Sequence, residues 1–191
     1  MRHNLVILLG VQGSGKGTVA AELMHSHDYD YIETGALFRG FDRTSPLGAE
    51  IGAVLDAGGL VSDDLAWRLV KSRLNPGKDI LADGFPRTLH QAGWLLDWAN
   101  AHDFATRVVL LNIPRATALQ RIRTRAAEGG GRTDDSDPAA VARRLDIYYK
   151  QTEPMEKFLK NAPGVRFFDI DGTKGKEAVL QSVREQLAVS S

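Results

Sequence analysis

The sequence contains no cysteine, which excludes disulfide bonds, thiolate metal sites and cysteine nucleophiles. It also lacks an excess of either charge, because 24 lysine and arginine residues balance 24 aspartate and glutamate residues. A balanced chain offers no basic tail or face, so we expect no nucleic-acid partner. Any role of arginine or lysine must therefore come from the placement of individual residues.

Long apolar runs are missing as well. The first apolar stretch, Leu5 to Leu9, has five residues, whereas a signal peptide needs a longer run and a membrane-spanning helix needs about 20 residues. We therefore expect no membrane association and a cytoplasmic protein. A length of 191 residues favours one compact domain with a substantial core.

Short segments rich in Val, Ile, Leu and aromatic residues alternate with helical patterns. Strands are predicted at Leu5–Leu9, Tyr29–Ile32, Asp79–Ala82, Val108–Ile113 and Val165–Ile170. Helices are predicted at Gly17–His25, Asp63–Leu74, Leu89–Ala101, Arg115–Ala127, Ala139–Phe158 and Lys176–Leu187. This alternation is typical of an α/β fold with a parallel sheet covered on both faces.

Two stretches interrupt the alternation. Arg39 to Gly59 is rich in glycine and small residues, and Glu128 to Asp137 separates two predicted helices. Long excursions in compact α/β domains are usually functional flaps or disordered loops. The second one ends at Asp137-Pro138, which is typical of a helix start with Asp as the N-cap.

A glycine-rich segment follows the first predicted strand, Gly10-Val11-Gln12-Gly13-Ser14-Gly15-Lys16-Gly17-Thr18. Its Gly-x4-Gly-Lys spacing is that of a phosphate loop, in which backbone N–H groups and a helix N-terminus surround phosphate oxygens. Gly17 stands where the general motif has Ser or Thr, so Thr18 is the best hydroxyl for magnesium. The segment predicts binding of a nucleoside triphosphate. The alternatives are a turn without a ligand and a dinucleotide loop, in which Glu33 would bind ribose.

Several polar clusters follow the other predicted strands. Thr34-Gly35-Ala36-Leu37-Phe38-Arg39 follows the second strand, where open α/β sheets bind ligands, although a helix cap with a surface arginine is as good a reading. Gly58-Gly59-Leu60-Val61-Ser62-Asp63-Asp64 reads as a stop, a turn and a capped helix.

The third cluster is Asp83-Gly84-Phe85-Pro86-Arg87 with Gln91 one helical turn on. Asp83 can hold magnesium or its waters, Arg87 can grip a phosphate, and Gln91 has a donor and an acceptor for a base edge. A turn followed by a capped helix is the alternative.

Arginines gather around the second interruption, namely Arg121, Arg125, Arg132 and Arg144. Arg121 and Arg125 share a helix face, and Arg132 follows three glycines. Phosphoryl transfer needs dispersed positive charge and exclusion of water, and a flap that carries arginine meets both needs. A solvated basic helix face is the alternative.

Together these motifs resemble those of the adenylate kinases, in the nucleoside monophosphate kinase family. The resemblance extends from about Leu5 to Lys174 and includes Asp83-Gly84-Phe85-Pro86-Arg87, Arg144-Leu145 and Asp171-Gly172-Thr173. It implies the P-loop NTPase fold, with a five-stranded parallel sheet in the order 2-3-1-4-5 wrapped by helices. It further implies one domain over residues 1–191, a monophosphate-binding lobe at 34–62 and a short lid at 128–137. The Phe85-Pro86 bond would be cis.

The resemblance also implies the roles of individual residues. ATP would be bound by Gly13, Ser14, Gly15, Lys16, Gly17, Thr18, Arg121, Arg125 and Lys174. AMP would be bound by Thr34, Arg39, Leu60, Val61, Gly84, Arg87, Gln91, Arg132 and Arg144. The catalytic residues would be Lys16, Arg87, Arg121, Arg125, Arg132 and Arg144. Thr18 and Asp83 would serve Mg²⁺, the latter through water, and Asp134 and Asp135 would anchor the lid.

The implied reaction is reversible transfer of phosphate from ATP to AMP, giving ADP, by a monomer whose lid and lobe move. We expect no structural zinc, because the chain has neither cysteine nor the larger inserted lid. Gln91 favours AMP, since the related UMP/CMP kinases usually carry Asn at that position. A kinase for CMP, UMP or GMP is the first alternative, and a P-loop NTP hydrolase or switch is the second. The chain departs from the common family pattern at Gln12, Ala36 and Ser62.

Overall fold

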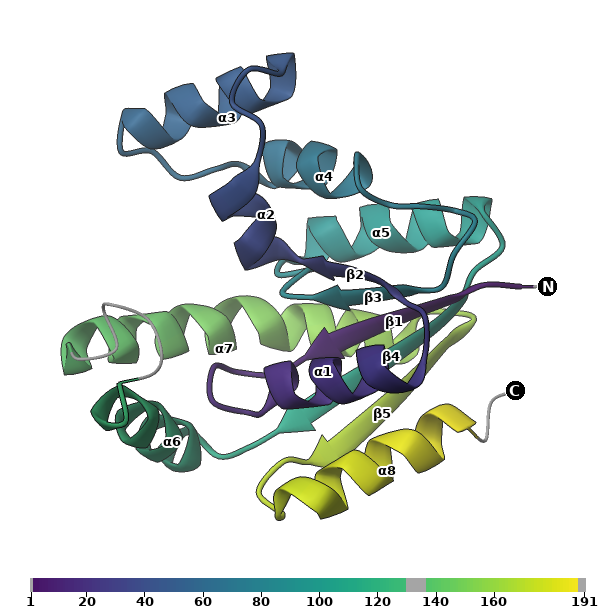
Figure 1. Ribbon diagram of the computed structural model, residues 1–191, viewed down its shortest axis with the longest axis vertical. Coiled ribbons are helices and arrows are strands. Elements are labelled where there is room, and N and C mark those ends of the chain that lie inside the picture. Colours follow the sequence, from purple (N-terminus) through teal and green to yellow (C-terminus); the bar gives the residue numbers. More distant parts are fainter. Residues whose placement is uncertain (1, 130–136, 189–191) are drawn as a thin grey trace.

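The computed structural model describes residues 2–129 and 137–188. Its strands are β1 (Asn4–Leu9), β2 (Asp30–Glu33), β3 (Ile80–Asp83), β4 (Ala105–Asn112) and β5 (Val165–Asp171). They form one sheet in the order β2-β3-β1-β4-β5, and every neighbouring pair is parallel. The predicted α/β class and strand order are confirmed. Because the strands are parallel, their carboxyl ends share one edge of the sheet (Figure 1).

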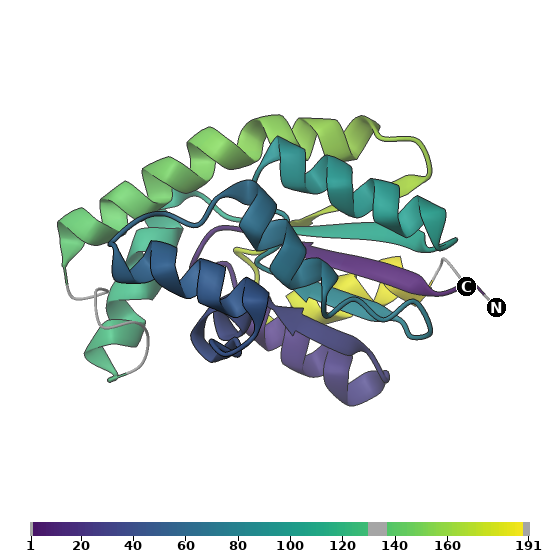
Figure 2. The same cartoon turned by 90° about the horizontal axis from the view of Figure 1, so that it is seen from above.

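Helices connect the strands and cover both faces of the sheet. They are α1 (Lys16–Ser26), α2 (Thr34–Gly40), α3 (Pro46–Asp56), α4 (Asp63–Lys71), α5 (Leu89–Ala101), α6 (Arg115–Ala127), α7 (Pro138–Asn161) and α8 (Lys176–Ala188). Figure 2 shows α5 and α7 on one side of the sheet and α1 and α8 on the other.

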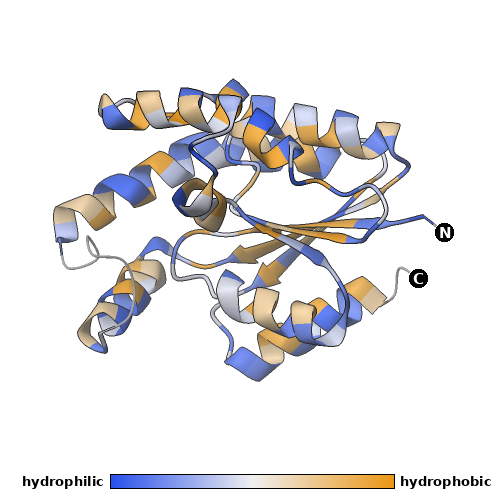
Figure 3. Cartoon of the chain, turned by 45° about the horizontal axis from the view of Figure 1, so that its top comes forward, coloured by the Kyte–Doolittle hydropathy of each residue, from blue (hydrophilic) through white to orange (hydrophobic). Residues whose placement is uncertain are grey.

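The alternation along β1 explains these two layers. Leu5 and Ile7 lie in the apolar cluster that includes Met155 of α7, whereas Val6 and Leu8 lie in the cluster that includes Val19 of α1. Successive side chains of a strand point to opposite faces, so an unbroken apolar run supplies both clusters. Figure 3 shows the result as apolar strands between helices that carry polar residues on their outer faces.

Residues 39–59, for which the sequence analysis predicted no helix, are largely helical. They contain the end of α2 and all of α3. Ser45 caps α3 by accepting a hydrogen bond from the Gly48 backbone N–H at 3.1 Å, and Pro46 occupies the first turn. A Cβ on Gly48 would lie 1.8 Å from the carbonyl oxygen of Asp42, so this glycine serves close packing and does not break the helix.

The predicted lobe at residues 34–62 packs against α4 through a small apolar cluster. Ile51 of α3 is fully buried against Leu65 and Leu69 of α4, with Leu37 and Phe38 of α2 packed around them. Figure 1 shows α3 as the helix farthest from the sheet on this side. The division of the chain into one domain with this lobe and a lid at 128–137 stays a prediction, and residues 130–136 lie outside the described part.

The other element predictions are confirmed with shifted ends. The bounds of α5 and α6 are as predicted, whereas β4 begins at Ala105, three residues earlier than expected. Thr106 and Arg107 are polar, but both are buried in the sheet and pair with Leu5 and Val6 of β1. Among the described helices, none combines the length and apolar character that crossing a membrane requires.

Candidate active site

The phosphate loop, residues 10–18, joins the carboxyl end of β1 to α1. Gly10 has a φ of 145°, and a Cβ there would lie 2.8 Å from the carbonyl oxygen of Leu111 on β4. Gly15 has a φ of 102° and is the N-cap of α1. Residues other than glycine rarely adopt such φ values, so the loop conformation needs glycine at both positions. The loop thereby presents the N-terminus of α1 at the carboxyl edge of the sheet.

Lys16 is directed back across this loop. Its Nζ donates to the carbonyl oxygen of Gly10 at 2.6 Å. Apart from its chain neighbours and the backbone of α1, a Cβ built on Gly15 or Gly17 meets no atom of the described residues within 4 Å, so the space next to these two glycines is open. Thr18, in the first turn of α1, is exposed beside this opening. The position of Lys16 and the open loop fit a triphosphate.

Asp83 ends β3 next to the loop and is buried. Its Oδ2 accepts a hydrogen bond from the Tyr31 hydroxyl at 3.3 Å, and its carbonyl oxygen accepts from Thr34 Oγ1 at 3.3 Å. Burial raises the pKa of Asp83, while the charges of Lys16 and Arg87 act in the opposite direction. The carboxylate therefore lies within the electrostatic reach of a cation from the phosphate loop and of one from the segment after β3.

Two of the four arginines predicted to bind AMP, Arg39 and Arg87, are exposed and have protein partners. Arg39 Nη2 donates to Glu33 Oε1 at 3.1 Å, and Arg87 Nε donates to the Gly84 carbonyl oxygen at 2.8 Å. The Phe85–Pro86 bond next to Arg87 is cis, as the resemblance implies. Gly84 and Thr34 are neighbours, since a Cβ on Gly84 would lie 3.6 Å from Thr34. Residues from β2, α2 and the end of β3 thus converge on one region.

Gln91 is buried, with 5% of its surface exposed, and both ends of its amide are engaged. Its Oε1 accepts from the Arg87 backbone N–H at 2.8 Å, and its Nε2 donates to Asp63 Oδ1 at 2.7 Å. Asp63 Oδ2 also accepts from Thr88 Oγ1 at 2.6 Å, and Thr88 caps α5. Gln91 therefore lies beside Arg87, in an orientation set by α4 and by the segment before α5.

Several residues that the sequence predicts to bind ATP lie around the phosphate loop. Arg121 Nη1 of α6 lies 3.4 Å from the Gly13 carbonyl oxygen, and Arg125 is exposed one turn further along α6. Gly172 donates to the Asn112 carbonyl oxygen at 2.8 Å, and a Cβ there would lie 3.4 Å from the Ser14 carbonyl oxygen. The segment that contains Lys174 therefore passes close to the phosphate loop.

Of the other predicted site residues, Arg144 lies on α7, and Leu60 and Val61 lie just before α4. Arg144 of α7 is half-buried, and Val61 packs against the lobe cluster. The Leu60 side chain is 95% exposed. Arg132, Asp134 and Asp135 lie outside the described residues. The assignment of all these residues to ATP or AMP stays a prediction.

Three residues of the region were not assigned a catalytic or binding role from the sequence. Tyr31 holds Asp83, Glu33 pairs with Arg39, and Asp63 holds Gln91. Glu33 had been considered only as a ribose ligand of a dinucleotide site, and Asp63 only as part of a helix start. Their proximity to predicted site residues along the chain was the available signal for Tyr31 and Glu33.

The oxygen-bearing side chains of this region suit a magnesium ion that is bound together with a nucleotide. Within residues 2–129 and 137–188, no three His, Asp or Glu side chains form a group that could hold a metal ion by themselves. Mg²⁺ usually keeps several waters and takes one or two carboxylates plus substrate phosphates. Asp83, with Thr18 in the first turn of α1, fits that pattern. The expectation of no structural zinc stays a prediction.

Comparisons with known proteins agree with this geometry. A sequence model of the family described as adenylate kinase matches residues 8–163. The adenylate kinase of Cyanothece sp. is 37% identical over 190 residues, covering 95% of each chain. The adenylate kinase of Thermus thermophilus is 36% identical over 188 residues, covering 96% of this chain and 97% of its own. That of Prochlorococcus marinus is 30% identical over 186 residues, covering 96% and 98%. With a phosphate loop at the carboxyl edge of a 2-3-1-4-5 sheet and relatives matched over nearly its whole length, the chain belongs to the adenylate kinase family.

Proposed function

We propose that the chain transfers the γ-phosphoryl group of ATP directly to AMP, giving two molecules of ADP. The observation that carries the proposal is the position of Asp83, which pairs with Leu8 just before the phosphate loop and directly precedes Gly84, whose carbonyl oxygen accepts from Arg87 Nε at 2.8 Å. Lys16 belongs to the donor loop and Arg87 to the acceptor segment. Transfer between two bound phosphates requires these two groups of cations to meet at one place.

Each group of residues then has a defined task. The phosphate loop and Lys16 hold the triphosphate, while Arg39 and Arg87 hold the phosphate of the acceptor. Arg121, Arg125, Arg132 and Arg144 surround the migrating group and disperse its charge. Closure of the lobe at 34–62 and the lid at 128–137 excludes water, which would otherwise hydrolyse ATP.

Asp83 and Thr18 would hold Mg²⁺ with the triphosphate, the former through water. The ion supplies positive charge that neutralises the phosphates and fixes their geometry. Burial raises the pKa of Asp83 and thus disfavours its ionised form. A cation bound beside Asp83 would favour the ionised form again. The proposal further takes the protein to act as a monomer in the cytoplasm, with ATP, AMP and ADP as its partners.

A panel of acceptors tests the proposed function. Purified protein is assayed with Mg-ATP and with AMP, dAMP, CMP, UMP or GMP, and ADP formation is measured directly. AMP is expected to give the highest kcat/KM. A better acceptor among the other nucleotides would assign the chain to another monophosphate, and phosphate release without any acceptor would assign it to hydrolysis.

Substitution of Lys16 tests the mechanism. Lys16→Met should lower kcat by about 1,000-fold, because it removes a preorganised charge from the transferring phosphate. Lys78→Met is the matched control, since Lys78 is an exposed lysine before β3 that pairs with Asp28 at 3.1 Å. Full turnover by the Lys16→Met variant would contradict the mechanism.

A further inference from the structure

The amide of Gln91 can be oriented in only one way by its protein neighbours. Arg87 offers a backbone N–H, which can only donate, and Asp63 offers a carboxylate, which accepts. Turning the amide over would place Oε1 against the carboxylate and Nε2 against the N–H. Both hydrogen bonds would be lost and both contacts would become repulsive, in a residue that is 5% exposed and has little access to water.

With its amide held in this orientation, Gln91 has one hydrogen-bond donor and one acceptor left for a ligand. An amide oxygen accepts two hydrogen bonds and an amide nitrogen donates two, so Oε1 has one acceptor position left and Nε2 has one N–H left. Adenine offers an amino group at C6 as donor and N1 as acceptor, which is the complementary pair. Hypoxanthine and guanine offer a C6 oxygen as acceptor and an N1–H as donor, which is the opposite pair.

We propose that Asp63 is a positioning residue which, by fixing the amide of Gln91, restricts the acceptor to nucleotides whose base has an amino group next to a ring nitrogen acceptor. The inference rests on the proposed function, in which Gln91 contacts the base of the monophosphate. Asp63 does not itself touch the substrate. It acts through Gln91, because a carboxylate at this place makes the reversed orientation of the amide unfavourable.

Thr88 and the start of α4 hold Asp63 in place. Thr88 Oγ1 donates to Asp63 Oδ2 at 2.6 Å and also caps α5, accepting from the Gln91 backbone N–H at 3.3 Å. Ser62 caps α4 directly before Asp63. The ionisable ring of His90 faces the same carboxylate, with Nδ1 at 3.9 Å from Asp63 Oδ2. With both oxygens bound to neighbouring side chains, the carboxylate has little freedom to turn.

The test compares AMP with IMP, which differs from AMP only in the groups at C6 and N1 of the base. In the unmodified protein, kcat/KM should favour AMP by about 1,000-fold or more, since a site built to hydrogen-bond a group strongly rejects an analogue with the opposite pattern. An asparagine side chain can donate as well as accept, so Asp63→Asn removes one of the two repulsions that prevent reversal. The AMP:IMP ratio should then fall by about 10-fold.

Asp64→Asn is the matched control. Asp64 is the next residue of the same first turn of α4, so both substitutions remove one negative charge from the same helix N-terminus. The Asp64 carboxylate is exposed and lies 3.8 Å from Arg68. Its replacement should leave the AMP:IMP ratio within about twofold. A structural defect in Asp63→Asn would lower the rates with AMP and IMP in parallel and leave the AMP:IMP ratio as it is. An unchanged ratio would therefore overturn the proposal.

A measurement on the unmodified protein covers the case in which Asp63→Asn does not fold. In ¹⁵N-labelled protein, the two Nε2 protons of Gln91 are followed by NMR, and Gln91→Ala identifies their signals. On addition of AMP, the proton bound to Asp63 should keep its shift while the other one moves. Equal movement of both protons, or of neither, would overturn the proposal. If the unmodified protein transferred no phosphate to AMP, the proposed function would fail instead.

Discussion

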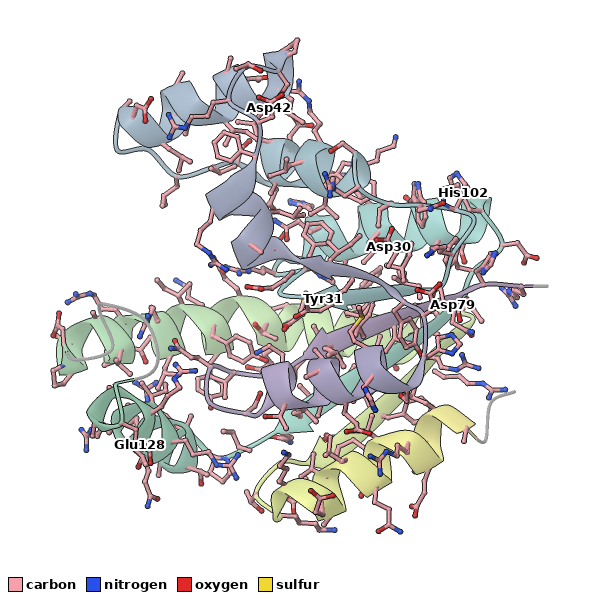
Figure 4. All side chains as sticks on the ribbon, in the orientation of Figure 1. Asp30, Tyr31, Asp42, Asp79, His102 and Glu128 are labelled. Carbon is pink, nitrogen blue, oxygen red and sulfur yellow. The ribbon has the colours of Figure 1, made fainter. Side chains whose placement is uncertain are left out.

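Replacing Asp79 with asparagine tests how the amino edge of the sheet is held together. Asp79 precedes β3, and its carboxylate accepts hydrogen bonds from the Asn4 backbone N–H at 2.9 Å and from Asn4 Nδ2 at 2.8 Å. His3 Nδ1 lies 3.1 Å from one oxygen, and His27 Nε2 lies 2.9 Å from the other. Figure 4 shows Asp79 near the amino end of β1, on the side away from Glu128 after α6.

The pKa of Asp79 sets the size of the effect. Burial alone would raise this pKa, but hydrogen bonds from Asn4, His27 and His3 outweigh burial and lower the pKa to about 2. A carboxyl group lowered from an ordinary value near 4 to about 2 contributes roughly 2.5 kcal/mol at neutral pH. The His3 and His27 side chains are 38% and 51% exposed, so solvent screening reduces the contribution. We expect Asp79→Asn to cost about 1–2 kcal/mol at pH 7.

The pH dependence has a definite sign. Because the pKa of Asp79 is depressed in the folded chain, its stabilisation is complete above about pH 4 and disappears as the pH falls toward 2. Urea unfolding followed by circular dichroism at pH 7, 5, 4 and 3 measures the gap between the two proteins, which should shrink below pH 4. Asp28→Asn is the control, since the Asp28 side chain is 85% exposed. A cost at pH 7 no larger than that of Asp28→Asn, or a gap unchanged at pH 3, would refute the reasoning.

Two further predictions concern the candidate active site. Under the proposed function, Glu33 would compete with the phosphate of AMP for Arg39. Glu33→Gln should then lower the KM for AMP by about threefold with little change in kcat, as expected for loss of an exposed ion pair. Steady-state kinetics measures this, and an unchanged or higher KM would contradict it. The Ser14 hydroxyl is buried without a hydrogen-bond partner among the described residues, so Ser14→Ala should raise the free energy of unfolding by about 1 kcal/mol. If the Ser14 hydroxyl does have a hydrogen-bond partner, Ser14→Ala will instead lower the free energy of unfolding, and urea unfolding measures this.

The sequence predicted those features that depend on local pattern. The start of α5 follows from Thr88, whose hydroxyl accepts from the Gln91 backbone N–H, and the predicted bounds of this helix are confirmed. The strands were found because each contains a short stretch dense in apolar or aromatic residues, and β4 was predicted too short because Thr106 and Arg107 are polar yet buried. α3 was not predicted because residues 39–59 are rich in glycine and small residues, although one of these glycines, Gly48, serves the close approach of α3 to Asp42.

The side-chain partners in the site could not be predicted from the sequence. Asp63 and Gln91 are 28 positions apart, and their hydrogen bond depends on how α4 packs against α5. At its own position, Asp63 has the pattern of any acidic residue in the first turn of a helix. Such a pattern specifies that a carboxylate is present but not which side chain it contacts.

Arg39 and Gln91, which are both predicted to bind AMP, differ in how firmly their protein partners hold them. Arg39 is exposed in its pair with Glu33, and such a pair contributes only about 0–1 kcal/mol, so a phosphate can replace the carboxylate at little cost. Gln91 is buried between two groups of fixed polarity, and reversing its amide would leave both unsatisfied. Under the proposed function, changes at Glu33 therefore alter the affinity for the phosphate of any acceptor. Changes at Asp63 alter which base is accepted.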